Sequence, residues 1–138
     1  MIRKEPWLRS MRENGVPVSL LQSMPYAQYV ASLERVAVGL QPIVSEFSKG
    51  KSFGKLLACM SSEVAIVCSD AADHALVFDG TNGMLARSVD DWVDAILRYL
   101  DSPAEREDAT ARAYRDYCEK LTTPVAARAL ESVISMFR

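Results

Sequence analysis

Histidine is almost absent from this sequence, which has His74 alone among 138 residues. The three cysteines, Cys59, Cys68 and Cys118, are far apart and form neither a CxxC pair nor a Cys/His ligand spacing. A structural zinc site needs four closely spaced ligands, and a disulfide framework needs an even set of cysteines. We therefore expect neither a zinc site nor disulfides, and no other bound metal. The cysteines are interpreted as buried thiols in a reducing compartment.

The sequence also lacks an excess of charge and a long apolar run. The formal net charge is −2, and the lysines and arginines are scattered, which gives no electrostatic footprint for nucleic acid. No apolar run approaches the ~18 residues that span a bilayer. Glu5-Pro6 stands where a signal peptide has its apolar region. We therefore expect a cytoplasmic protein without a transmembrane segment, with peripheral attachment to a membrane as the alternative.

What the sequence does contain is the composition of a globular domain. Apolar residues make up 49% and charged residues 25%, which argues against disorder. The length predicts one domain over residues 1–138 with a single sizeable core.

Residues 36–70 are expected to organise that domain. They hold two apolar runs, 36–40 and 64–68, separated by a polar loop and a short helical pattern over 53–60. Strand, loop, helix and strand in this length form a βαβ unit, which requires the two strands to be parallel. The runs are continuous rather than alternating, as in strands that helices cover on both faces.

The secondary structure of the segments on either side of this unit is predicted from their periodicity and turn residues. Helical patterns cover 5–13 and 26–34, and residues 16–21 predict a brief edge strand weakened by Pro17. After the unit, an apolar run at 75–78 meets the turn sequence 79–83 and a short strand at 84–86. We expect a hairpin or a sharp bend there.

The last third predicts three helices. Ser88 with Asp91, and Ser102 with Glu105, are each typical of a capping box, and Thr123-Pro124 repeats the cap-proline arrangement. The middle helix should run to about residue 121. Its expected apolar face holds Ala111, Tyr114, Cys118 and Leu121. The apolar stripe of the last helix holds Ala126, Ala129, Leu130, Val133, Ile134 and Phe137. The expected fold is therefore α/β, with a Rossmann-like, mostly parallel sheet, helices on both faces and a helical C-terminal third.

The loop over residues 45–52 is the first candidate site, because ligands of parallel sheets bind beyond the strand carboxyl ends. It opens a helix, whose unpaired N–H groups suit phosphate, and Lys49, Lys51 and Lys55 add positive charge. Gly50-Lys51-Ser52 resembles the end of a P-loop, but that motif needs a glycine where Ser45 stands, so we reject an NTPase. The alternative is a solvated strand-to-helix turn.

Two further features have a functional and a structural interpretation. His74 follows the second strand and is a candidate general base, although no nucleophile is placed beside it; the alternative is a hydrogen-bonded loop histidine. The turn at 79–83 can line a site through its backbone or serve only as a turn.

The ordered set of motifs resembles the C-terminal half of group 1 glycosyltransferases of the GT-B type. Members show a strand ending in proline, a "GKS…K…E" helix, an "IxDGxNG" turn, and a tryptophan-bearing helix followed by "DxxxR". This sequence supplies, in that order, Pro42, Gly50-Lys51-Ser52, Lys55, Asp79-Gly80, Asn82-Gly83, Trp92 and Asp101 to Arg106. The likeness covers residues 25–120.

The resemblance implies half of a GT-B fold that binds a nucleotide-sugar donor without a metal or other cofactor. It implies transfer of the sugar to a saccharide-type acceptor, as in surface polysaccharide biosynthesis, with a loop that stabilises the leaving diphosphate. The implied donor contacts are Gly50, Lys51, Ser52 and Lys55, followed by the turn residues Asp79, Gly80, Asn82 and Gly83.

Two departures from the family pattern limit that expectation. Ala58 stands where members carry a glutamate that holds the donor ribose, a loss of about 1–3 kcal/mol. The acceptor domain and the first strands of the donor domain are missing, which predicts an exposed sheet edge and a partner chain or homo-oligomer. The alternative is a non-catalytic remnant or protein-interaction module. A receiver-like signalling domain is a weaker third possibility, because its acidic cluster is not evident.

Overall fold

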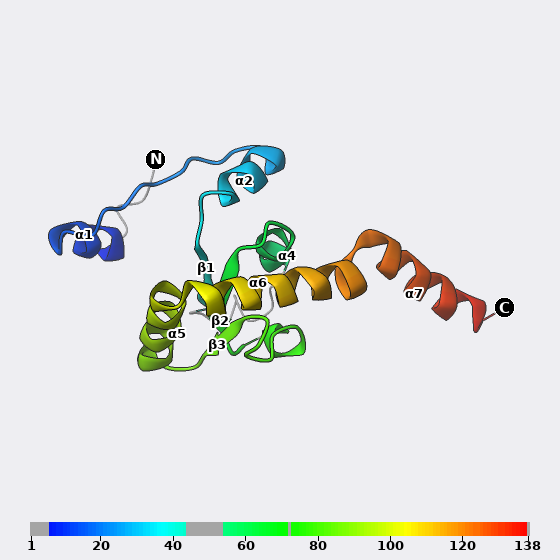
Figure 1. Ribbon diagram of the computed structural model, residues 1–138. Coiled ribbons are helices and arrows are strands. Elements are labelled where there is room, and N and C mark those ends of the chain that lie inside the picture. The colour runs from blue at the N-terminus through cyan, green and yellow to red at the C-terminus, as the bar shows by residue number, and fades with distance from the viewer. Residues whose placement is uncertain (1–5, 44–53, 72, 138) are drawn as a thin grey trace.

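Three short parallel strands form the centre of the fold (Figure 1). The computed structural model describes residues 6–43, 54–71 and 73–137. The strands are β1 (Val38–Gln41), β2 (Ala65–Ser69) and β3 (Met84–Ala86), in the sheet order β1-β2-β3. Both neighbouring pairs are parallel, so the expected α/β fold with a parallel sheet is confirmed.

The central unit has the predicted connection. Helix α4 (Gly54–Ser61) lies between β1 and β2 in the chain, and Val38 pairs with Ala65 at the start of the ladder. Because a helix joins two neighbouring parallel strands, their carboxyl ends, Gln41 and Ser69, lie at the same edge of the sheet.

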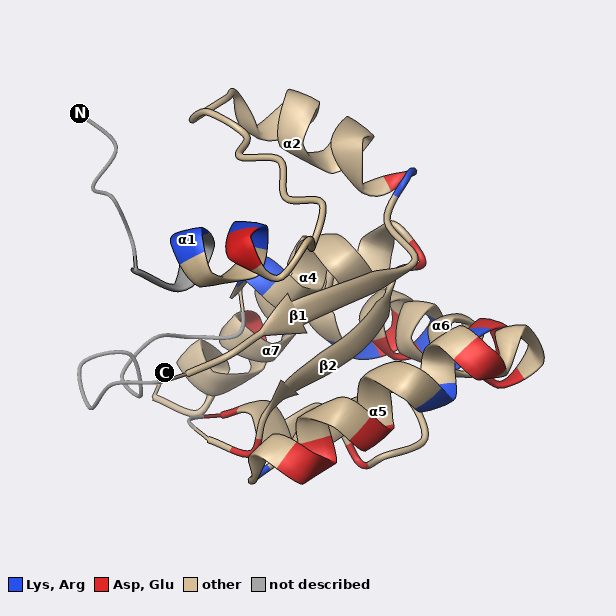
Figure 2. Ribbon diagram, turned by 90° about the vertical axis from the view of Figure 1, so that its left-hand side faces the viewer, with Lys and Arg blue, Asp and Glu red and all other residues tan. Residues whose placement is uncertain are grey.

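Alternate residues of β2 face two apolar clusters on opposite sides of the sheet. Ile66 and Cys68 pack with α4 on one face, and Ala65 and Val67 pack with α5 and α6 on the other. Figure 2 shows β1 and β2 with α4 on one side and α5 on the other. Helices α5 and α6 span Val89–Asp101 and Pro103–Asp116. The continuous apolar run of this strand thus has the predicted cause, which is burial on both faces.

The chain before the sheet is less regular than predicted. Helices α1 (Pro6–Glu13) and α2 (Tyr26–Leu33) are present, but the expected strand at 16–21 is wrong, because residues 16–25 have no regular secondary structure. Pro17 has no N–H to give to a ladder, and Leu21 is 70% exposed, so no core face holds this segment to the sheet.

The approach to β3 is not a hairpin. Residues 75–78 form the end of a 3-10 helix, His74–Leu76, and the chain that leads from it, and β3 pairs in parallel with β2. Leu76 is 86% exposed while Phe78 is buried, so this apolar run does not form a strand. The sharp bend that was the other expectation is present at the turn over 79–83, where Gly80 has a φ of +90°.

Helices α5 and α6 begin where their caps predict, whereas α7 begins at the expected cap Thr123 itself, with Thr122 as its N-cap and no side-chain cap hydrogen bond. Ser88 and Asp91 form a reciprocal capping box on α5, and the Ser102 hydroxyl accepts from the Glu105 N–H at 3.4 Å on α6. Helix α6 ends at Asp116 and continues as a π-helical turn, η2 (Tyr117–Leu121), before α7 (Thr123–Ser135). Among the described residues, none of the helices has the length and apolar character that crossing a bilayer requires.

The buried face of α6 is not the predicted one. Ala109, Thr110 and Ala113 are buried, whereas Tyr114 and Cys118, which were expected on the inner face, are exposed. The expectation that all cysteines are buried is therefore wrong for Cys118, although it is confirmed for the other two. The prediction placed Tyr114 inside because of its large apolar ring. In the structure the small side chains of Ala109 and Ala113 face inward instead, because they let α6 approach both the sheet and α4 closely.

A buried amide fastens the turn before β3 to the distant end of α6. Asn82 is 4% exposed, and its Nδ2 donates to the Val77 carbonyl at 2.8 Å and to the Asp116 carboxylate at 2.7 Å. Its Oδ1 accepts from the Asp79 N–H at 3.2 Å. Asp116 also pairs with Lys120. The turn is therefore held by side-chain contacts across 34 residues of sequence.

We predict that Asn82→Ala lowers the free energy of unfolding by about 1–3 kcal/mol, because it removes the hydrogen bonds that this buried amide makes to the Val77 carbonyl and the Asp116 carboxylate. Urea unfolding followed by circular dichroism measures the change. The matched control is Thr81→Ala, an exposed neighbour in the same turn, with an expected loss below about 1 kcal/mol. Equal losses for the two variants would contradict the role given to the buried amide.

The same contact predicts a pH dependence. The Lys120 ammonium, and further the Asn82 amide, lower the pKa of the Asp116 carboxyl. A carboxyl whose pKa is lowered on folding stabilises the fold above its unfolded pKa of about 4, and that stabilisation is lost as the pH falls through the lowered value. Asp116→Asn should therefore lose less unfolding free energy between pH 7 and pH 3 than the wild type. An unchanged loss would contradict this.

Candidate functional site

The carboxyl ends of the three strands surround a cavity of about 470 Å³. Each strand contributes residues that follow its last ladder position: Pro42 and Ile43 after β1, Asp70 after β2, and Arg87 after β3. This is the edge at which open parallel sheets bind ligands, so the cavity is the leading candidate site.

Hydrogen bonds between the strand ends fix the floor of this cavity. The Ser69 hydroxyl accepts from the Ile43 N–H at 2.9 Å, and the Asp70 N–H donates to the Ala86 carbonyl at 3.0 Å. The three loops are therefore joined to one another where they leave the sheet.

An ion pair between Asp70 and Arg87 crosses the cavity wall. The Asp70 carboxylate raises the pKa of Arg87, whose side chain is 77% exposed. A guanidinium binds phosphate with the same forked geometry with which it binds a carboxylate, so Arg87 can exchange Asp70 for an anionic ligand.

The mouth of the cavity is shaped by the first turn of α5. The Asp91 carboxylate accepts from the N–H groups of Arg87 and Ser88, and these hydrogen bonds lower the pKa of Asp91. These hydrogen bonds hold the backbone of Arg87 in place, and its side chain extends from there. One position further on, Trp92 is partly buried and lines the cavity, where its ring offers a flat apolar surface.

Of the predicted donor contacts, Lys55 is on the same side of the fold as this edge. It lies in the first turn of α4 and, with Gly54, Tyr26 and Tyr29, lines a second cavity of about 390 Å³. The two tyrosine rings are 6.3 Å apart between centroids. Gly50, Lys51 and Ser52 lie outside the described residues.

The predicted turn residues do not join Lys55. Asp79, Gly80, Asn82 and Gly83 precede β3, so they lie toward the amino ends of the strands, at the edge opposite the 470 Å³ cavity. Thr81 donates to the Asp79 carboxylate through its N–H and hydroxyl, which lowers the pKa of Asp79.

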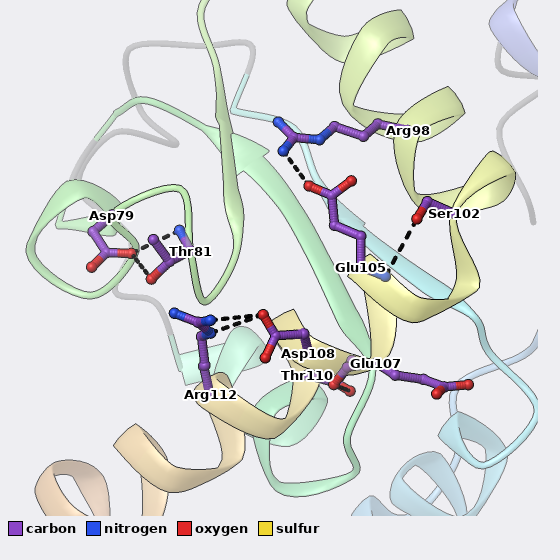
Figure 3. A network of polar contacts seen from close by, with 9 residues as sticks. All are labelled: Asp79, Thr81, Arg98, Ser102, Glu105, Glu107, Asp108, Thr110 and Arg112. Atoms are coloured by element: carbon purple, nitrogen blue, oxygen red, sulfur yellow. Dashed lines mark hydrogen bonds and ion pairs between the residues drawn. The ribbon is translucent and has the colours of Figure 1, made fainter.

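Polar contacts of α5 and α6 surround this turn (Figure 3). Arg98 pairs with Glu105, and Arg112 pairs with Asp108 at 2.8 Å. Together with Gly80 and Thr81 they line a cavity of about 170 Å³, much smaller than a site for a nucleotide. Each cation there already has a carboxylate partner, so this edge offers little free positive charge to a phosphate.

The histidine is a structural residue. His74 is 1% exposed, and its Nδ1 lies 2.9 Å from the Ser69 carbonyl oxygen. Because a carbonyl only accepts, Nδ1 carries the proton. This is the hydrogen-bonded loop histidine of the structural interpretation.

Two buried residues of α4 and β2 offer no reactive or hydrogen-bonding group to a ligand. Ala58 is 1% exposed and packs in the α4 cluster, so it offers no hydrogen bond to a ligand. Burial raises the pKa of Cys68 to about 12, which removes its thiolate at neutral pH. Among the described residues, no group of three or more His, Cys, Asp and Glu could hold a metal ion.

The sequence analysis named Lys55, which lines the second cavity, but it named neither Arg87 nor a cavity role for Trp92. The signal that could have found Arg87 is its position, directly after a strand and before a helix cap, where parallel strands place ligand contacts. Trp92 was interpreted first as packing, because its helical spacing is equally typical of a core residue.

Comparison with known proteins identifies one family. No curated protein and no solved structure shows significant similarity to the chain. The model of one family, described as glycosyl transferase-like, matches residues 3–131, which is nearly the whole sequence. The chain therefore belongs to the glycosyl transferase-like family.

Proposed function

We propose that the chain binds a nucleotide-sugar donor at the carboxyl ends of its strands and acts as the donor half of a glycosyltransferase. The observation that carries this proposal is the 470 Å³ cavity at that edge of a parallel sheet, in a chain of the glycosyl transferase-like family. A nucleoside diphosphate needs cationic groups for its phosphates and a flat surface for its base, and Arg87 and Trp92 supply one of each.

The diphosphate in this proposal is held from two sides. Arg87 approaches from the β3 side of the edge, and Lys55, in the first turn of α4, approaches from the β1 side. Gly50, Lys51 and Ser52 precede α4 in the sequence and are proposed as further contacts. The amide end of α4 adds a favourable dipole. These groups stabilise the negative charge that develops on the diphosphate as the bond to the sugar breaks.

In this proposal the chain binds only the donor. A partner domain or a partner chain binds the acceptor, and without that partner the chain binds the donor but does not transfer the sugar. The turn at 79–83, held by Asn82 at the opposite edge, has a structural role in this proposal rather than a contact with the donor.

A second candidate, a non-catalytic remnant of the family, is favoured by Ala58. The family glutamate that holds the donor ribose is replaced by a buried alanine, so one ribose contact is lost. That loss amounts to about a tenfold to hundredfold reduction in affinity. The first experiment below distinguishes the two candidates.

We predict that UDP, GDP or ADP binds with micromolar affinity in calorimetric titration, and that Lys51→Ala and Lys55→Ala each weaken binding about tenfold or more, because each removes a charge-assisted hydrogen bond. The matched control is Arg128→Ala, which removes one exposed positive charge from α7 and should leave the affinity unchanged. Absence of heat with all three nucleotides would favour the remnant.

We further predict opposite effects for the two members of the cavity ion pair. Arg87→Ala should weaken binding of the nucleoside diphosphate about tenfold but leave binding of the corresponding nucleoside nearly unchanged, because only the diphosphate needs the cation. Asp70→Asn should not weaken the diphosphate, since it frees the guanidinium. Equal losses for diphosphate and nucleoside in Arg87→Ala would contradict a phosphate contact.

A further inference from the structure

The last helix leaves a long apolar stripe uncovered. On and just after α7, Leu130 is 60% exposed, Val133 51%, Ile134 46% and Phe137 86%. Figure 1 shows α7 leading away from the sheet beyond the end of α6, and the neighbour that it contacts most is η2. A stripe of this kind, on a helix that packs against little else in the described part of the chain, is typical of an interaction surface.

The stripe has the spacing of a coiled-coil seam. Ala126, Leu130, Val133 and Phe137 recur at intervals of four, three and four residues, which is the alternation of the two core positions in a heptad. The flanking positions, which usually carry charges that select a partner, are uncharged here; they are Ala127, Ala129, Ile134 and Met136. The charges of α7, Arg128 and Glu131, fall outside the seam.

We propose that α7 is a self-association surface on which a second copy of the chain packs antiparallel. In that arrangement Leu130 of one copy meets Val133 of the second copy, and Ala126 meets Phe137 of the second copy. The largest side chain therefore faces the smallest at both ends. A parallel pair would instead place alanine on alanine and phenylalanine on phenylalanine, leaving one layer empty and crowding another.

The exposed area is sufficient for a weak dimer. From their exposed fractions, the large apolar side chains of the stripe and Met136 offer on the order of 600 Å² per copy. Two copies that cover this area completely bury at most about 1,200 Å², the lower end of specific interfaces. The two-fold relation makes the patch its own complement, so no second patch is needed. This proposal is independent of nucleotide binding.

The first test is sedimentation equilibrium of the full chain. We expect a monomer–dimer equilibrium with a dissociation constant on the order of 10 µM. Leu130→Glu combined with Val133→Glu should weaken it more than about tenfold, because two carboxylates would be buried in the seam. The matched control, Ser132→Glu, adds a carboxylate on the opposite side of the helix and should change the constant less than about twofold. Far-UV circular dichroism verifies that each variant keeps its helix content.

A disulfide test fixes the direction of packing. Ala127→Cys and Ile134→Cys are combined in a Cys118→Ser background, which removes the exposed native thiol. These positions lie two turns apart on one helix, too far for a disulfide within the chain. In the antiparallel pair, each lies beside the other in the second copy, so mild oxidation should give a covalent dimer. A monomeric wild type up to about 1 mM, a dimer that persists in the Leu130/Val133 variant, or no covalent dimer in the cysteine variant would overturn the proposal.

Discussion

The parallel pairing of β1 with β2 around α4 is the constraint on which the rest of the structure depends. It places the ends of both strands at one edge, and the parallel addition of β3 brings a third end to the same place. The hydrogen bonds of Ser69 and Asp70 then join the three exits. Without this arrangement, Arg87 and Trp92 would have no common cavity to line.

Burial on both faces makes that pairing possible. The side chains of β2 alternate between two apolar clusters, so its first four residues are buried on both faces of the sheet and only Ser69, at its end, is polar. β1 is different, because it lies at the edge of the sheet and Leu40 is 50% exposed. The stability of the sheet therefore comes mainly from the helices that cover its middle strand.

The sequence predicted the elements whose signals are local. Two continuous apolar runs around a helical pattern sufficed for the parallel unit, and hydroxyl caps sufficed for the starts of α5 and α6. It failed where tertiary contacts decide. Residues 75–78 are as apolar as a strand, but only Phe78 is fully buried in the core, with Val77 packed against it. On α6, periodicity fitted both an aromatic face and an alanine face, and close packing selected the alanines.

The candidate site was predictable in part for the same reason. The place of Lys55 in the first turn of a helix after a strand is visible in the chain, whereas its contact with a ligand stays a prediction. The separation of the turn at 79–83 from that site could not be predicted. Between β2 and β3 the chain crosses from one edge of the sheet to the other, and the order of the motifs along the sequence does not show this crossing. The pairing of Arg87 with Asp70 joins residues 17 apart through the ladder register.

The contact between Asn82 and Asp116 also has a consequence for any fragment made from this chain. A chain shortened to end after β3 or α5 would keep the three described strands, yet it would lack the carboxylate that anchors the entry to the third one. The third strand therefore depends on the helical end of the domain as well as on its neighbour in the sheet. A fragment that is to keep this anchor has to extend at least through residue 116.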